Sequence, residues 1–339
     1  MEPGGKIIQV VKPARKDMNR RFAGNDFQQG DSILNVGDRI KINHLMALAS
    51  IGVANIAVRR KPRIGLFSTG KELLDNSTQD GAQRIMDING PCITATLMDW
   101  GCDVDFLGVI DDNASAVSGK LMRRLQHQKY DLVITTGGVS AGKFDFVRKA
   151  IESIGAKVLF HGAGIRPGHP ALFATLPAGR YGNTHVGDNC SNNEQTSTAF
   201  FGLPGNPVAS TACLRFLVVP FLRQFLSEQS ETPMKAIIRD ERIHAKSEET
   251  YDMRETRATI ARFPPSTDIF RAGRFIGWPI DYFHVEIIRD HSPGKVKPFL
   301  HADCWVHVPR GHTELRDGDI LDIFPICKKG NSVATFLGS

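Results

Sequence analysis

Residues 130–145 read YDLVITTGGVSAGKFD, an apolar run that leads into a glycine-rich, hydroxyl-bearing turn and then into a helix start at Asp145. A strand, such a turn and a helix together aim backbone N–H groups at a bound anion. Gly137 and Gly138 have no Cβ, so the backbone can bend sharply and approach a ligand closely. With the hydroxyl of Ser140 beside them, they predict a site for a phosphate or another oxyanion.

A nucleotide-binding P-loop is the first alternative for this turn. Gly137, Gly142 and Lys143 have the P-loop spacing, but the next residue is Phe144, which cannot supply the hydroxyl that holds Mg²⁺. We also find no convincing acidic strand end that would complete a nucleoside triphosphatase. The second alternative, a tight turn that binds nothing, stays open on this segment alone.

The composition is that of a globular protein with more than one domain. The chain has 339 residues, of which 41% are hydrophobic and 23% charged, and its net charge is +6. This charge suits a small anionic ligand, but it is spread along the chain and does not indicate a nucleic-acid partner. We find no signal core and no apolar run near membrane-spanning length, so we expect a cytoplasmic protein without a membrane partner.

The six cysteines and eleven histidines show no metal-binding spacing. Cys92 and Cys213 lie in apolar helical patterns, which favours reduced, buried thiols.

Three zones differ in their pattern of strand, helix and turn residues, and they predict three domains, at residues 1–62, 63–228 and 229–339. The first zone holds short β-type pieces, turn residues and one helix near residues 43–52. The middle zone alternates strands and helices, which predicts an α/β domain with a mainly parallel sheet covered on both faces. The last zone alternates short strands and turns, which indicates a small all-β barrel or sandwich.

The middle zone can be divided into elements by its hydrophobic periodicity. Strands are expected at 64–68, 104–110, 132–136, 157–160, 172–175 and 199–203, and helices at 91–100, 114–126, 146–154 and 207–225. Asn206 can cap the last helix, which is apolar all round, and Pro220 should kink or divide it. The polar stretch 177–197 is interpreted as an inserted surface loop.

Several of these strands and helices meet in turns that carry charged or glycine residues. Because ligands bind outside the carboxyl ends of parallel strands, such turns could share one site. Taken singly, Asp87, Asn89, Asp112 and Asn206 are more typical of helix caps than of ligands. Taken together, carboxylates beside basic and glycine-rich segments predict a phosphorylated substrate bridged by a hard cation such as Mg²⁺.

The motifs in this order resemble the molybdopterin molybdenumtransferases, the bacterial MoeA group with its plant and gephyrin E-domain relatives. The resemblance covers about residues 15–228 and implies a MoaB/Mog-like middle domain. It rests on Ser68-Thr69-Gly70-x-Glu72-Leu73, Asp87-x-Asn89-Gly90, Gly137-Gly138-Val139-Ser140-x-Gly142-x-x-Asp145, Arg166-Pro167-Gly168-x-Pro170 and Leu203-Pro204-Gly205-Asn206-Pro207-Val208. Support in the tail comes from Ala302-Asp303-Cys304-Trp305-x-x-x-Pro309-Arg310-Gly311 and Gly318-Asp319.

The resemblance implies Mg²⁺-dependent insertion of molybdate into adenylylated molybdopterin, with release of AMP. Glu72, Asp112 and Asp145 would then be the catalytic carboxylates, as Mg²⁺ ligands or by activating water. Arg166 would add positive charge to the site. Arg21 and Asp26 would approach the site across a homodimer, although without the resemblance they would be interpreted as a surface ion pair. The remaining substrate-binding positions implied are Thr69, Gly70, Asp87, Asn89, Gly137, Gly138, Val139, Ser140, Pro167, Gly168, Pro204, Gly205, Asn206 and Pro207.

The chain also departs from the family pattern. About a hundred residues that normally precede this region, including an Asp-Gly-Tyr-Ala segment, are not in the sequence, which suggests a fragment, an unusual gene model or a short paralogue. Lys71, Lys143, Gly162 and His169 replace residues of different chemistry.

Two other functions therefore stay open. One is molybdopterin adenylyltransfer, whose loop usually reads Gly-Gly-Thr-Gly and whose enzyme is also a possible partner. The other is a molybdopterin-binding scaffold without turnover.

Overall fold

The computed structural model describes residues 11–13, 15–74, 85–139, 145–177, 197–240, 259–277, 282–290 and 292–326. The predicted insertion at 177–197 lies almost wholly outside these residues, as do Ser140, Gly142, Lys143 and Phe144. The chain separates into two compact units, residues 1–59 and 60–339. The domain boundaries at 62 and 228 stay predictions.

The described residues of the first unit form one helix, α1 (Ile42–Ser50), and a series of turns. The predicted turns are present, with Gly24, Gly30 and Gly37 in the left-handed region. The β-rich character predicted for this zone is not found among its described residues, which contain no strand. Leu48 is the one described residue of this unit that is buried, so a strand here would have no apolar core to pack against.

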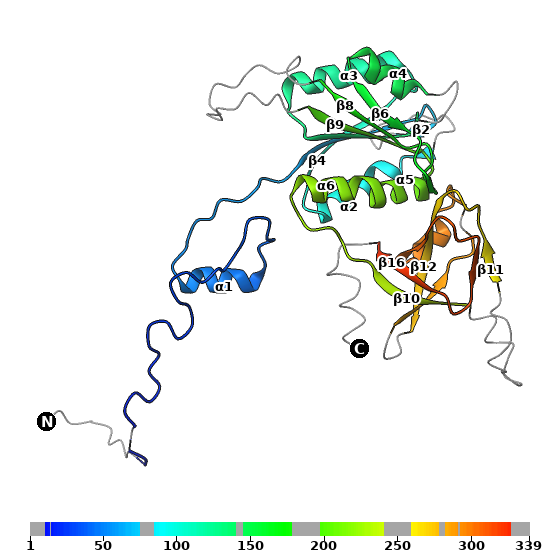
Figure 1. Ribbon diagram of the computed structural model, residues 1–339. Helices are drawn as coiled ribbons and strands as arrows, with labels where there is room; N and C mark the ends of the chain where they lie inside the picture. The colour runs from blue at the N-terminus through cyan, green and yellow to red at the C-terminus, as the bar shows by residue number, and fades with distance from the viewer. Residues whose placement is uncertain are drawn as a thin grey trace, which may run out of the picture. The chain divides into compact units, whose positions relative to one another are not determined.

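The second unit is built on a six-stranded sheet with the order β4-β1-β5-β9-β8-β6 (Figure 1). Strands β4, β1, β5 and β9 are parallel, and β8 runs antiparallel to its neighbours β9 and β6. This confirms the mainly parallel sheet, with one reversed strand. The strands are β1 (Arg63–Thr69), β4 (Asp103–Ile110), β5 (Leu132–Thr136), β6 (Lys157–His161), β8 (Leu172–Leu176) and β9 (Thr198–Leu203).

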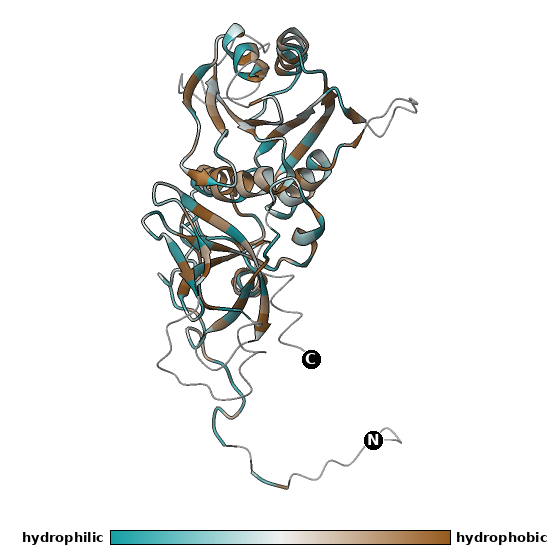
Figure 2. Ribbon diagram, turned by 90° about the vertical axis from the view of Figure 1, so that its right-hand side faces the viewer, coloured by the Kyte–Doolittle hydropathy of each residue, from teal (hydrophilic) through white to brown (hydrophobic). Residues whose placement is uncertain are grey.

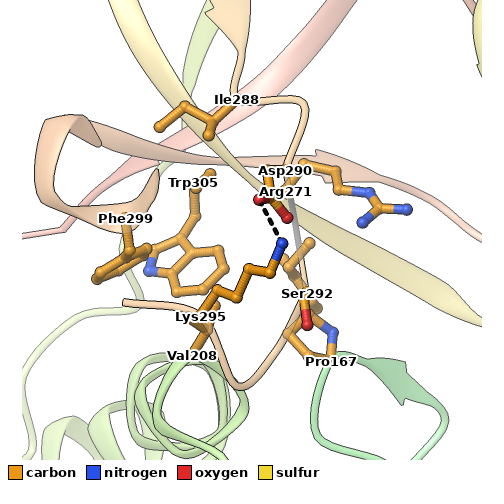
Figure 3. A pocket seen from close by; sticks show the side chains of 11 residues that line it. Pro167, Val208, Arg271, Ile288, Asp290, Ser292, Lys295, Phe299 and Trp305 are labelled. Atoms are coloured by element: carbon orange, nitrogen blue, oxygen red, sulfur yellow. Dashed lines mark hydrogen bonds and ion pairs between the residues drawn. The ribbon is translucent and has the colours of Figure 1, made fainter. Parts of the chain in front are cut away.

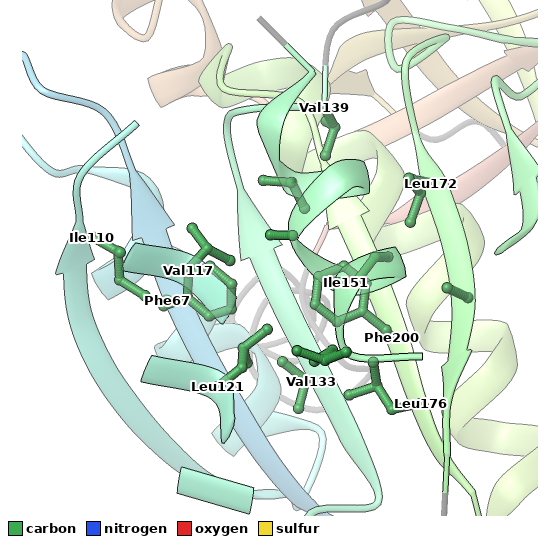
Figure 4. Close-up of a cluster of buried hydrophobic side chains, with 14 of the residues drawn as sticks. Phe67, Ile110, Val117, Leu121, Val133, Val139, Ile151, Leu172, Leu176 and Phe200 are labelled. Atoms are coloured by element: carbon green, nitrogen blue, oxygen red, sulfur yellow. The ribbon is translucent and has the colours of Figure 1, made fainter. Parts of the chain in front are cut away.

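Helices cover both faces of this sheet, because its inner strands are apolar on both sides. On one face, α3 (Ala114–His127) and α4 (Phe146–Ser153) enclose a cluster that includes Phe67, Val133 and Phe200 (Figure 4). On the other, α2 (Asn89–Asp99) and the helical run 207–225 enclose a second cluster. A two-stranded sheet, β2 (Leu73–Leu74) with β3 (Ile85–Met86), precedes α2.

The helical run at 207–225 is divided, as predicted, but by a π-helical turn. It consists of α5 (Pro207–Cys213), the π-helix η1 (Leu214–Val218) and α6 (Val219–Phe225), with Pro220 in the first turn of α6. The run is long and apolar enough to be a candidate membrane span, which corrects our expectation from sequence. Just over half of it is buried inside the molecule, and core helices pass the same test.

The two thiols predicted to be buried, those of Cys92 and Cys213, differ in their exposure to solvent. Cys213 is buried, and burial raises the pKa of its thiol to about 12. Cys92 is exposed, because it lies on the face of α2 that points away from the sheet.

The C-terminal strands form the predicted barrel. The ring closes because β13 pairs with both β10 and β12, while β16 and β14 complete the circle. Its strands are β10 (Met234–Arg239), β12 (Asp268–Gly277), β13 (Phe283–Ile287), β14 (Cys304–Val308) and β16 (Ile320–Pro325). A second hairpin pairs β11 (Thr259–Arg262) with β15 (Glu314–Arg316), and a 3-10 turn, η2, covers Lys297–His301.

A short strand of the middle zone joins this barrel. Strand β7 (Ile165–Arg166) pairs in parallel with β12, so that Ile165 lies opposite Asp268 and Arg166 opposite Ile269. Figure 2 shows the apolar strands of both sheets and the apolar helices that lie next to the barrel. The loop that carries Arg166 is therefore held by the central sheet and by the barrel.

Candidate functional site

The predicted turns meet at one edge of the central sheet. Thr69 is in register with Ile110, Ser68 with Thr136, and Thr136 with Leu203, so four parallel strands end together. His161 at the end of β6 is paired with Leu172, which in turn lies opposite Gly202. The segment that follows β6 and contains Arg166 therefore begins at this same edge.

A small polar network joins three of the strand ends. The hydroxyl of Thr69 donates to the Thr136 carbonyl at 3.0 Å. The side-chain amide of Asn89 donates to the Gly205 carbonyl at 2.7 Å and to the Thr136 hydroxyl at 3.4 Å. All three side chains are almost fully buried, so the network fixes the strand ends relative to the first turn of α2.

Gly137 lies where two of these turns touch. Its φ of +84° belongs to the left-handed region, and a Cβ here would lie 2.6 Å from the Thr69 carbonyl oxygen. We expect Gly137→Ala to lower the free energy of unfolding by about 2 kcal/mol or more, because strain and overlap add. Chemical denaturation measures the change.

The matched control is Gly119→Ala on α3, where an added Cβ meets nothing within 4 Å. That substitution should stabilise the chain by roughly 0.5–1 kcal/mol. Equal stability of the two variants would contradict the close approach at Gly137.

Asp87 caps α2, as its sequence context favours. Its Oδ1 accepts from the backbone N–H groups of Asn89 and Gly90, each at 3.1 Å. Its Oδ2 is buried and has no hydrogen-bond partner among the residues that the structure describes. An unsatisfied buried carboxylate oxygen is costly, so this atom is available to a polar group of a ligand.

Glu72 lies close enough to Asp112 for its charge to act on that carboxylate, and the two are called the Glu72–Asp112 pair below. Burial raises the pKa of Asp112, and the negative charge of Glu72 raises it further, while a hydrogen bond from the Lys71 backbone opposes the increase. Two like charges in one place are the arrangement that a divalent cation relieves. Asn113, not Asp112, caps the following helix α3, since its side chain accepts from the backbone of Ser115 at 2.8 Å.

Asp145 lies apart from that pair, at the start of α4. Its Oδ1 accepts from the Arg148 backbone at 3.3 Å, and its Oδ2 lies 3.4 Å from His161 Nδ1. The other ring nitrogen of His161 donates to the Val139 carbonyl at 3.0 Å. One imidazole thus contacts both flanks of segment 140–144. Within the described ranges, no three His, Cys, Asp or Glu side chains are placed to hold one metal ion together.

A cleft of about 500 Å³ lies between this sheet edge and the barrel. The segments 166–170 and 204–206 line one side, and β12 and the end of β11 line the other. Three arginines and His169 line it, and none of its described lining residues is acidic. The cleft is therefore strongly positive, which suits an anionic ligand.

The three arginines differ in their partners. Arg262 is balanced by Glu314 at 3.2 Å. Arg271 is mostly buried and its guanidinium lies over the Phe263 ring, and Arg166 lies near enough to affect its charge. Burial lowers the pKa of Arg271 to about 10, and Arg166 lowers it further. Among the described residues neither Arg166 nor Arg271 has a carboxylate partner, so a bound anion would satisfy both.

A second, much smaller cavity of about 20 Å³ lies on the other side of β12. Figure 3 shows Lys295 extended towards Asp290, beside the indole of Trp305. The Lys295 Nζ donates a hydrogen bond to Asp290 Oδ2 at 2.8 Å. The volume would hold one water molecule and no pterin.

The predicted residues are distributed over this edge as follows. Arg166, Pro167, Gly168, Pro204 and Asn206 line the cleft. Thr69, Gly70, Asn89, Gly137, Gly138, Val139, Gly205 and Pro207 build the turns beside it. Asn206 precedes α5 as expected but makes no side-chain cap hydrogen bond.

Two predicted residues lie in the other unit. Arg21 and Asp26 are exposed, and the described part of the first unit shows no ion pair between them; Arg20 pairs with Asp17 instead. Their approach to the site stays a prediction. Sequence reasoning missed His161, Arg271 and Asp268, although an arginine inside the apolar run at 269–272 was a detectable signal.

Comparison with known proteins finds similarity to proteins of molybdenum cofactor biosynthesis. Residues 65–224 match the family described as "Probable molybdopterin binding domain". A molybdopterin molybdenumtransferase of Staphylococcus aureus is 27% identical over 318 residues, which is 93% of this chain and 66% of the relative. One from Nostoc is 28% identical over 239 residues, or 66% of this chain and 50% of the relative. The chain thus spans between half and two thirds of the length of these relatives.

The fold is also similar to a solved structure. The molybdopterin biosynthesis MoeA protein of Pyrococcus horikoshii has a TM-score of 0.66 with 21% identity. The match covers 89% of this chain and 64% of that protein, and it supports the fold alone.

Proposed function

We propose that the chain is a member of the molybdopterin molybdenumtransferase (MoeA) family, to which it is similar over most of its length. It would act in molybdenum cofactor biosynthesis by inserting molybdate into adenylylated molybdopterin with release of AMP. The carrying observation is the positive cleft at the carboxyl edge of the sheet, where Arg271 and Arg166 lack carboxylate partners among the described residues. A tetrahedral oxyanion would pair with both guanidiniums, and the glycine-rich turn beside them suits a phosphate.

The residues present fit a magnesium ion. Mg²⁺ takes one or two carboxylates together with substrate phosphates and water, and the pair Glu72–Asp112 supplies the carboxylates. A bound Mg²⁺ would neutralise charge on the pyrophosphate of the substrate. Asp145 is not part of this pair and is free to serve another step.

The chain's own residues would divide the work. The N–H groups of the glycine-rich turn that follows β5 would bind the phosphates, since this turn lies at the carboxyl edge of the sheet. Arg166 and Arg271 would hold molybdate near the pterin. Asp145, fixed by the α4 backbone and facing His161, would orient the water that attacks the pyrophosphate and accept its proton.

A direct assay tests this proposal. The full chain is incubated with adenylylated molybdopterin, Mg²⁺ and molybdate, and AMP is measured by chromatography. Release of AMP that requires molybdate is the expected result. Tight binding of the pterin without AMP release would instead support a binding protein, and formation of adenylylated pterin from molybdopterin and ATP would support the adenylyltransferase. A homodimer and an adenylyltransferase partner are part of the same proposal.

A further inference from the structure

The short strand β7 is the element that brings Arg166 to the cleft, and it contributes only two residues to the barrel sheet. Arg166 lies opposite Ile269, and Arg271 is two residues further along β12. Because side chains alternate along a strand, both arginines project from the same face. Their charges repel each other, and two ladder positions alone are a weak attachment.

Asp268 lies at the point where β7 joins β12. Its backbone N–H donates to the Gly164 carbonyl at 3.0 Å, immediately before β7. Its carboxylate accepts from His307 Nε2 at 2.9 Å, from the Arg310 backbone at 3.2 Å and from Arg310 Nε at 2.9 Å. Burial alone would raise the pKa of Asp268, but these hydrogen bonds outweigh burial and lower the pKa.

Arg310 also contacts the chain that enters β7. A Cβ on Gly164 would lie 3.3 Å from the Arg310 guanidinium, so the guanidinium lies against this backbone. On the barrel side, the ring of His307 stacks on Phe270, and Phe270 stacks on Phe216 from η1. The three residues Asp268, His307 and Arg310, here called the Asp268 clamp, are thus packed against the barrel and the base of the Arg166 loop. Phe270 connects them to the helical run.

We propose that the Asp268 clamp positions the oxyanion site: it holds β7 against β12 and thereby keeps Arg166 beside Arg271. The three residues touch no ligand themselves and act through Arg166. This inference rests on the proposed function, because the ligand it concerns is the oxyanion of the cleft. The inference adds that residues of the barrel partly determine the affinity of the cleft for this anion.

The experiment measures binding of inorganic molybdate to the full chain by calorimetry, without pterin. Asp268→Asn and Arg310→Gln should each weaken binding roughly tenfold, the effect expected when one cation of a site is misplaced. Arg310 is largely exposed, so its variant tests the clamp even if Asp268→Asn folds poorly. The matched control is Arg274→Gln, which removes another β12 ion pair, to Glu286 at 2.9 Å, and should bind molybdate like wild type.

A double-mutant cycle separates positioning from general destabilisation. In an Arg166→Gln background, Arg310→Gln should weaken molybdate binding no further, because its route of action is already gone. The same tenfold loss in that background would overturn the clamp while leaving the oxyanion site intact. If wild type binds no molybdate, the oxyanion site itself is wrong and the inference falls with it.

Discussion

An Asp145→Asn chain should fold as stably as wild type and yet release AMP at least about 100-fold more slowly. Asparagine is as good a helix cap as aspartate, so the bond to the Arg148 backbone that begins α4 is kept. What disappears is the negative charge that faces His161 and that could accept a proton. Single-turnover AMP release and chemical denaturation, measured on the same preparation, test both halves of the expectation.

The control for this variant is Glu152→Gln on the same helix. Glu152 forms an exposed ion pair with Arg148 at 2.9 Å, and such pairs contribute little. Its variant should therefore match wild type in both measurements. Wild-type turnover by Asp145→Asn would remove this carboxylate from the proposed chemistry, whereas loss of stability would mean that its role is structural.

The central sheet could be predicted from sequence because its signals are local. Each strand of the middle zone is a short apolar run that ends in a turn, as in β5, where all five residues are buried. Parallel strands place their carboxyl ends at one edge, so the meeting of Thr69, Thr136 and Leu203 follows from the pattern of alternating strands and helices. The capping role of Asp87 could also be predicted from sequence, because Asp87 lies directly before the start of α2.

The other half of the cleft was not predictable in this way. Arg271 faces Arg166 only because β7 pairs with a strand about a hundred residues later, and no local pattern encodes that pairing. The contacts of Asp268 depend on the same long-range register. His161 was overlooked because a single histidine at a strand end has no motif. The first zone has β-type sequence patterns, but its residues are nearly all exposed in the structure. No packing against a core therefore stabilises a strand there.

The charge of Arg271 is a cost to the folded chain when no anion is bound. Burial lowers the pKa of Arg271 in the folded state to about 10, well below its ordinary range, so folding disfavours the protonated form. The difference corresponds to about 3 kcal/mol. This cost is fully present below about pH 10 and decreases as the pH rises above that. A bound oxyanion would offset it at neutral pH, which is why such a residue indicates a binding site.

Arg271→Met should therefore change stability and binding in opposite directions. Without molybdate, the free energy of unfolding of this variant should be at least that of wild type, and up to about 1–3 kcal/mol higher. The reason is that an apolar side chain replaces a buried cation beside Phe263. Molybdate affinity should fall at least about 100-fold, since a mostly buried charge is lost from the site. Denaturation and calorimetry measure the two effects, and Arg274→Met on the same strand should leave both unchanged. A variant that loses stability and still binds molybdate would show that Arg271 supports the barrel rather than the anion.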